Sequence, residues 1–203
     1  MAGFDDNLVR EYFELNGFLV RPSRKHAGLS RRQRADEQGD LLAINPAPTS
    51  GSQPGFQLFN TDLAGLATAV IAIRPWHAAK AITPSMIRKG DWLEFIRKDA
   101  VEAAKEAFAG GSQPLTPKPA KILVLPGLPS GEPQRPESIA LLREQGVDHV
   151  LTLRTILENL VQAAETHPRQ AKSDTLQLLR LLRAYDMMNA AQLELFGAAH
   201  PFK

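Results

Sequence analysis

The feature that most constrains the fold is an uninterrupted apolar run, Thr68-Ala-Val-Ile-Ala-Ile73. It is the most continuous apolar stretch of the chain, and it lacks the polar positions that would mark an exposed face. A short run of this kind predicts a strand at the centre of a sheet, buried on both faces. Other parts of the chain must then provide neighbouring strands and the helices that cover them.

The expected elements alternate along the chain. Further strands are expected at residues 18–25, 41–44, 121–125 and 147–151, with a brief edge strand at 56–59. Helices are expected from Asp5 or Asp6 to Asn16 and at 94–108, 136–145, 153–166 and 173–196, with a helical turn after Thr83. This order predicts the α/β class, with a mixed central sheet flanked by helices, and it divides the chain into a core at 1–151 and a helical extension packed on it at 152–203.

Composition narrows the functional classes. The chain has 203 residues, of which 43% are hydrophobic, and it has no cysteine, so disulfides and thiolate metal sites are excluded. No phosphate loop of the Walker or Rossmann type and no nucleophile-elbow serine occur. No leader-like or membrane-spanning segment stands out, so we expect a cytoplasmic protein without a membrane partner.

Basic residues concentrate in one short stretch. The formal net charge is only +2, but no acidic residue interrupts the stretch before Asp36. Its members are Arg21, Arg24, Lys25, His26, Arg31, Arg32 and Arg34. Such a cluster can bind phosphates through counterion release, or it can be a solvated loop.

A second distinctive string, Arg74-Pro75-Trp76-His77, directly follows the central strand. Trp76 can stack on a base while Arg74 and His77 contact phosphate, which would add a nucleic-acid contact at the end of the sheet. The alternative is that Trp76 closes the end of the core and His77 bonds to backbone.

The order of elements and the acid in Gly39-Asp40-Leu41-Leu42 resemble the PD-(D/E)XK, or restriction-endonuclease-like, superfamily. In that family a helix precedes three strands, an acidic residue opens the second strand, and Glu-x-Lys lies on the third. The resemblance covers roughly residues 5 to 151. It implies a restriction-endonuclease-like core and Mg²⁺-dependent phosphodiester cleavage, in which Asp40 would bind the metal. The alternative for Asp40 is a turn cap before a strand.

The resemblance breaks at the third strand, where Ala72 stands in place of the glutamate and Arg74 in place of the lysine. Alanine cannot bind a metal, whereas Arg74 could still hold a scissile phosphate. Glu11 on the first helix is the preferred replacement ligand, ahead of Glu14 and Asp62; alternatively, Glu11 faces solvent.

Two functions follow from these residues. The first is nucleic-acid binding on a nuclease-like scaffold, with or without a degenerate metal-dependent endonuclease; Mg²⁺ is expected only in the catalytic case, with Asp40 and Glu11 as its ligands. The second is a non-catalytic structural or protein-interaction domain that kept the fold and lost the active site. For either function, the leucine-rich C-terminal helix could form a homodimer surface or pack within the chain.

Overall fold

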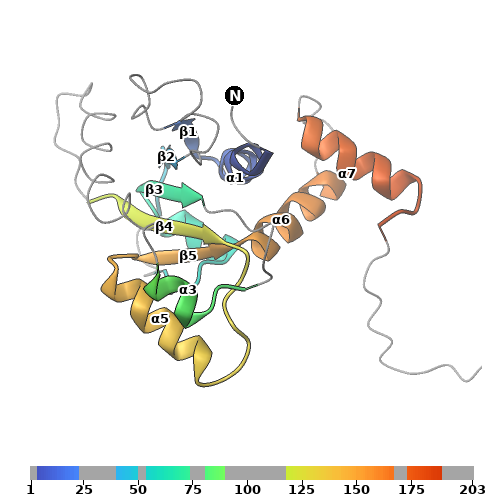
Figure 1. Cartoon of the computed structure of the whole chain (residues 1–203). Coiled ribbons are helices and arrows are strands. Elements are labelled where there is room, and N and C mark those ends of the chain that lie inside the picture. Colours follow the sequence, from blue (N-terminus) through green and yellow to red (C-terminus); the bar gives the residue numbers. More distant parts are fainter. Residues whose placement is uncertain are drawn as a thin grey trace, which may run out of the picture. The chain divides into compact units, whose positions relative to one another are not determined.

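The computed structural model describes residues 4–22, 40–49, 54–73, 81–89, 118–166 and 173–188 (Figure 1). Its strands are β1 (Leu19–Pro22), β2 (Asp40–Ile44), β3 (Thr68–Ile73), β4 (Ala120–Leu125) and β5 (His149–Thr152). Its helices are α1 (Phe4–Leu15), α3 (Pro84–Arg88), α5 (Gln134–Glu144), α6 (Leu153–Thr166) and α7 (Asp174–Ala184), with a 3₁₀ helix, η1 (Asn60–Gly65), before β3. The helix expected at 94–108 lies outside the described residues.

The five strands form one mixed sheet in the order β1-β2-β3-β4-β5. β1, β2 and β3 pair antiparallel, whereas β3, β4 and β5 pair parallel. Every residue of the central strand β3 is buried, as its apolar run predicts. The predicted α/β class with a mixed sheet flanked by helices is therefore confirmed.

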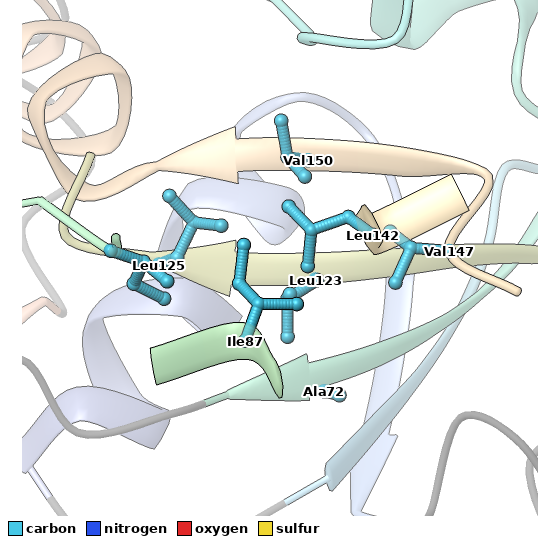
Figure 2. Packing of buried hydrophobic residues seen from close by; sticks show 8 residues of the cluster. Ala72, Ile87, Leu123, Leu125, Leu142, Val147 and Val150 are labelled. Carbon is cyan, nitrogen blue, oxygen red and sulfur yellow. The ribbon is translucent and has the colours of Figure 1, made fainter. Parts of the chain in front are cut away.

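One hydrophobic cluster joins a face of the sheet to α3 and α5. Its members are Ala72, Ile82, Ile87, Leu123, Leu125, Leu142, Val147 and Val150, all at most 5% exposed. Figure 2 shows Ile87 from α3 and Leu142 from α5 pointing toward Leu123 on β4. Gly146, in the left-handed region with φ +84°, turns the chain from α5 toward β5, and Val147 returns to this cluster.

The edge of β5 is covered by a short extended segment rather than by a full strand. Gln57 forms a single parallel bridge with Val150, whose amide donates to the Phe56 carbonyl at 2.7 Å. Arg143 lies over the Phe56 ring, and Arg135 donates to the Gln57 amide oxygen at 2.7 Å. The brief strand expected at 56–59 is thus one bridge, and it occupies backbone groups that would otherwise present an open sheet edge.

α1 is anchored by buried aromatic and amide groups. Phe13 packs edge-on against both Tyr12 and Phe18, while Gly17 turns the chain into β1 with φ +85°. The Tyr12 hydroxyl donates to Asn60 Oδ1 at 2.8 Å, and Asn16 donates to Asn159 of α6 at 3.1 Å. Figure 1 shows α1 on the other side of the sheet from α3 and α5.

This anchor predicts a specific loss of stability at alkaline pH. Burial, and then the Asp62 carboxylate, raise the pKa of the Tyr12 phenol above its usual value. Because the folded-state pKa is the higher one, the stabilisation is complete below the unfolded-state value of about 10 and is lost as the pH rises above it. We expect the melting temperature of the wild type to fall more steeply than that of Tyr12→Phe between about pH 9 and about pH 11, measured by circular dichroism. Parallel curves for the two proteins would clear Tyr12 of this role.

The chain divides into two compact units, Met1–Leu160 and Val161–Lys203. In the second unit Ser173 caps α7 by accepting from the Leu176 amide at 3.0 Å, and the helix ends at Ala184 rather than at the predicted residue 196. Arg180 donates to the Ala164 carbonyl, Arg183 pairs with Glu165, and Leu176 is fully buried. No helix in the described part of the chain is long and apolar enough to cross a bilayer.

Candidate functional site at the start of strand β2

Asp40 is the first residue of β2, and the sheet register places it directly opposite Ala72 on β3. Directly opposed residues point to the same face, with Cβ atoms about 5 Å apart. Ala72 is fully buried and belongs to the cluster with α3 and α5, while Asp40 is 8% exposed. Asp40 is therefore a largely buried residue whose directly opposed neighbour on β3 is a methyl group.

Arg21 shares this face of the sheet. It pairs with Leu42 across β1 and β2, and Leu42 lies two residues beyond Asp40 on the same strand. Side chains two apart on a strand point to one side, so Arg21 and Asp40 are diagonal neighbours. Diagonal positions are separated by about 7–8 Å, within reach of a side chain as long as arginine.

Most of the predicted nucleic-acid contacts lie outside the described residues. These are Arg24, Lys25, Arg31, Arg32, Arg34, Arg74, Trp76 and His77. Arg74 is the residue that follows Ile73, the last residue of β3, in the sequence. Of the predicted site residues, the structure places Arg21, Asp40 and Glu11, and it brings Arg21 and Asp40 to one face.

The acidic residues considered as replacement ligands occupy different places. Glu14 is exposed and pairs with Arg10 at 2.7 Å. Asp62 caps η1 by accepting from the Phe59 amide at 2.8 Å, and it precedes β3 at the end opposite Ala72. Each of these carboxylates is therefore already paired with another group of the protein, and each is distant from Asp40 in the sequence. Glu11 lies half-buried on α1, and its role as a ligand remains a prediction.

A magnesium ion, which the resemblance implies, requires oxygen ligands in near-octahedral geometry, and proteins commonly supply one or two carboxylates. The described residues contain no group of three or more His, Asp or Glu that could hold a metal ion. Between β2 and β3, the position opposite Asp40 is an alanine. A site at this place would need a carboxylate from another element.

Two features of the described chain escaped sequence reasoning. The diagonal relation of Arg21 to Asp40 depends on the register between β1 and β2, which residue spacing alone does not supply. His149 is half-buried and bonds through Nδ1 to the Gly55 carbonyl at 2.8 Å, where it helps to hold the segment beside β5.

No family model, curated protein or solved structure matches this chain.

Proposed function

We propose that this chain binds nucleic acid on a nuclease-like scaffold and does not cleave it. Support for the scaffold comes from a helix before three antiparallel strands and from the position of Asp40, which opens the second strand. The basic stretch from Arg21 to Arg34 supplies a phosphate-binding charge close to that strand in sequence.

The observation that carries the non-catalytic part is the pairing of Asp40 with Ala72. Metal-assisted phosphodiester hydrolysis requires carboxylates that converge on a cation able to activate water and polarise the phosphate. A methyl group at the facing position supplies no ligand. A chain that keeps its basic residues but lacks the second carboxylate is better suited to bind nucleic acid than to cleave it.

Salt-dependent binding tests this function. Anisotropy of a fluorescent duplex DNA and of a duplex RNA is measured between 50 and 200 mM NaCl, that is, over about a fourfold range of salt. If the protein neutralises about four phosphates, affinity is expected to fall about 100-fold over this range. The double variant Arg24→Glu/Lys25→Glu should bind far more weakly at the lower salt concentration.

The matched control is Arg10→Glu/Arg154→Glu, which changes the net charge by the same amount. Both arginines are exposed and form surface pairs within their own helices, with Glu14 and Glu158. This control is expected to bind nearly as the wild type does. Absence of binding at low salt, or equal weakening by both double variants, would remove the proposed contact surface.

Cleavage is tested with the same preparations. Supercoiled plasmid incubated with Mg²⁺ or Mn²⁺ is expected to remain uncut by the wild type, at the level seen with Asp40→Ala. Metal-dependent nicking that disappears in Asp40→Ala would reverse the non-catalytic part of the proposal and establish a nuclease.

The second candidate function is a non-catalytic interaction domain. It is favoured by exposed apolar residues on α7 and at its C-terminal cap: Leu178, Leu181 and Tyr185 recur at helical spacing and are 52%, 56% and 75% exposed. This candidate remains if neither DNA nor RNA binds at low salt.

A further inference from the structure

The turn that ends α1 contains a chemically labile pair of residues. Asn16 and Gly17 form the single Asn-Gly pair of the chain. In such a pair the glycine amide nitrogen can attack the asparagine side-chain carbonyl, because glycine has no side chain to hinder the approach. Whether the attack takes place depends on how the folded state holds the backbone and the asparagine side chain.

The backbone of this pair is held by two hydrogen bonds that close the C-terminus of α1. The Gly17 amide donates to the Glu14 carbonyl at 3.1 Å, and the Phe18 amide donates to the Phe13 carbonyl at 3.0 Å. This is the Schellman arrangement, in which the residue after the cap is left-handed, and Gly17 has φ +85°. A residue with a side chain would be strained there, so the turn favours glycine. The nitrogen that would attack is therefore bound to a carbonyl in the folded state.

The Asn16 side chain is held as well. Its Nδ2 donates to the Tyr12 carbonyl at 2.7 Å and to Oδ1 of Asn159 on α6 at 3.1 Å. Both partners accept, so this position requires a group that donates two hydrogen bonds, as a side-chain amide does. Asn16 and Gly17 therefore each have a structural reason to be present, and together they create the labile pair.

We infer that Asn16 is a deamidation site, which the folded protein protects and which opening of the α1 C-terminus exposes. In the reaction the Gly17 nitrogen bonds to Asn16 Cγ, the Cγ–Nδ2 bond breaks, and Nδ2 leaves as ammonia with the proton of the Gly17 amide. Water then opens the cyclic imide at either carbonyl, which gives aspartate or isoaspartate without a change in oxidation state. The inference is independent of nucleic-acid binding.

The product no longer fits the position that Asn16 occupies. A carboxylate donates no hydrogen bond at neutral pH, and the Tyr12 carbonyl can only accept one. The new negative charge would also lie at the C-terminus of α1, where the helix dipole disfavours an anion. Deamidation is therefore expected to weaken the anchor between α1 and α6, so that a chain modified while unfolded is less stable when it refolds.

Mass spectrometry of the full chain tests the protection. The protein is incubated in mildly alkaline buffer, with and without urea above its unfolding midpoint, and the peptide that contains Asn16 is followed for replacement of –NH₂ by –OH. The modification is expected to accumulate at least about tenfold faster in urea, because local opening limits the reaction in the folded chain. No modification of Asn16 in urea, or equal rates in the two buffers, would overturn the inference.

Asn159→Ala tests the contact with α6. The substitution removes one of the two acceptors, so modification of Asn16 without urea is expected to be about fivefold faster than in the wild type. Glu158→Ala, at the adjacent position of α6, is the matched control, because the Glu158 carboxylate forms an exposed pair with Arg154. Its rate should stay within about twofold of the wild-type rate. An unchanged rate in Asn159→Ala would overturn the protective role of this contact.

Asn16→Asp reproduces one product directly, and Asn16→Ala is its control. Both variants lose the donor, but only the aspartate adds a charge. Asn16→Asp is expected to melt about 4–8 °C below the wild type, and below Asn16→Ala as well. Melting of Asn16→Asp at the wild-type temperature would overturn the predicted loss of fit.

Wild type aged in urea replaces Asn16→Asp if that variant does not fold. After return to native buffer, modified chains are expected to be enriched in the fraction that stays unfolded. Equal modification of the folded and unfolded fractions would contradict the predicted loss of fit.

Discussion

Ala72→Glu is expected to destabilise the fold by about 3–5 kcal/mol at neutral pH in metal-free buffer, measured by urea denaturation. Ala72 is fully buried beside Ile87 and Leu123 (Figure 2), so the new carboxylate would lie among apolar side chains. Burial disfavours its charged form and raises its folded-state pKa. The penalty should therefore shrink as the pH falls toward about 5, where the folded-state carboxyl is protonated.

Ala72→Gln is the matched control, because it adds nearly the same volume without a charge. Both variants overpack the cluster, at a cost of about 1–3 kcal/mol, and only the glutamate adds a pH-dependent penalty. Equal stability of the two variants at pH 8 would show that the start of β2 is more open to water or cations than its burial indicates.

The Ala72→Glu variant also tests whether this position of the sheet can bind a metal ion, here Mn²⁺. The substitution places two carboxylates on directly opposed positions, Asp40 and residue 72. If these oxygens can share a cation, Mn²⁺ should raise the stability of Ala72→Glu and leave that of Ala72→Gln unchanged. Such a rescue would establish that this sheet position has metal-site geometry and lacks only the second acid.

Leu123→Ala is expected to destabilise the protein by about 3–4 kcal/mol and to lower its melting temperature by roughly 10 °C. Leu123 is fully buried on β4, where it contacts the side chains of the cluster from α3 and α5. Its truncation removes apolar contacts and leaves a cavity that parallel, doubly covered strands cannot easily close.

Leu19→Ala is the control for this substitution. Leu19 lies on the edge strand β1 of the same sheet and is 66% exposed. The same chemical change there should cost less than about 0.5 kcal/mol. A large loss in Leu19→Ala would indicate that the edge of β1 is covered in solution.

The bounds of a strand are predicted most accurately where its pattern of apolar residues fits only one kind of strand. The apolar run of β3 has the same bounds in the structure as in the sequence, because burial on both faces makes every residue after Thr68 apolar. Shorter elements shift by one or two residues: β2 begins at Asp40 rather than Leu41, and β5 begins at His149 rather than Val147. Val147 instead belongs to the cluster beneath α5, which local pattern does not reveal.

The candidate site, too, is only partly predicted by the sequence. Residue types alone identify Asp40 as an acid at a strand start and show that Ala72 cannot replace a glutamate ligand. They do not place Arg21 on the same face, because a register slip of one residue would send it to the other side of the sheet. The sequence therefore groups Arg21 with the basic stretch, whereas the β1–β2 ladder places it diagonally from Asp40.

Composition and the order of apolar segments by themselves determined the α/β class, the central position of Thr68–Ile73 and the absence of thiol chemistry. These depend on local patterns of burial and on which atoms the chain contains. Only the tertiary structure decided that Asp40 lies opposite a buried methyl group on β3 and that Arg21 lies on the same face of the sheet. The physical reason is that strand pairing brings together residues some twenty to thirty positions apart in the sequence. The strand register decides whether the neighbour of a charged side chain is a ligand, another charge or an apolar group.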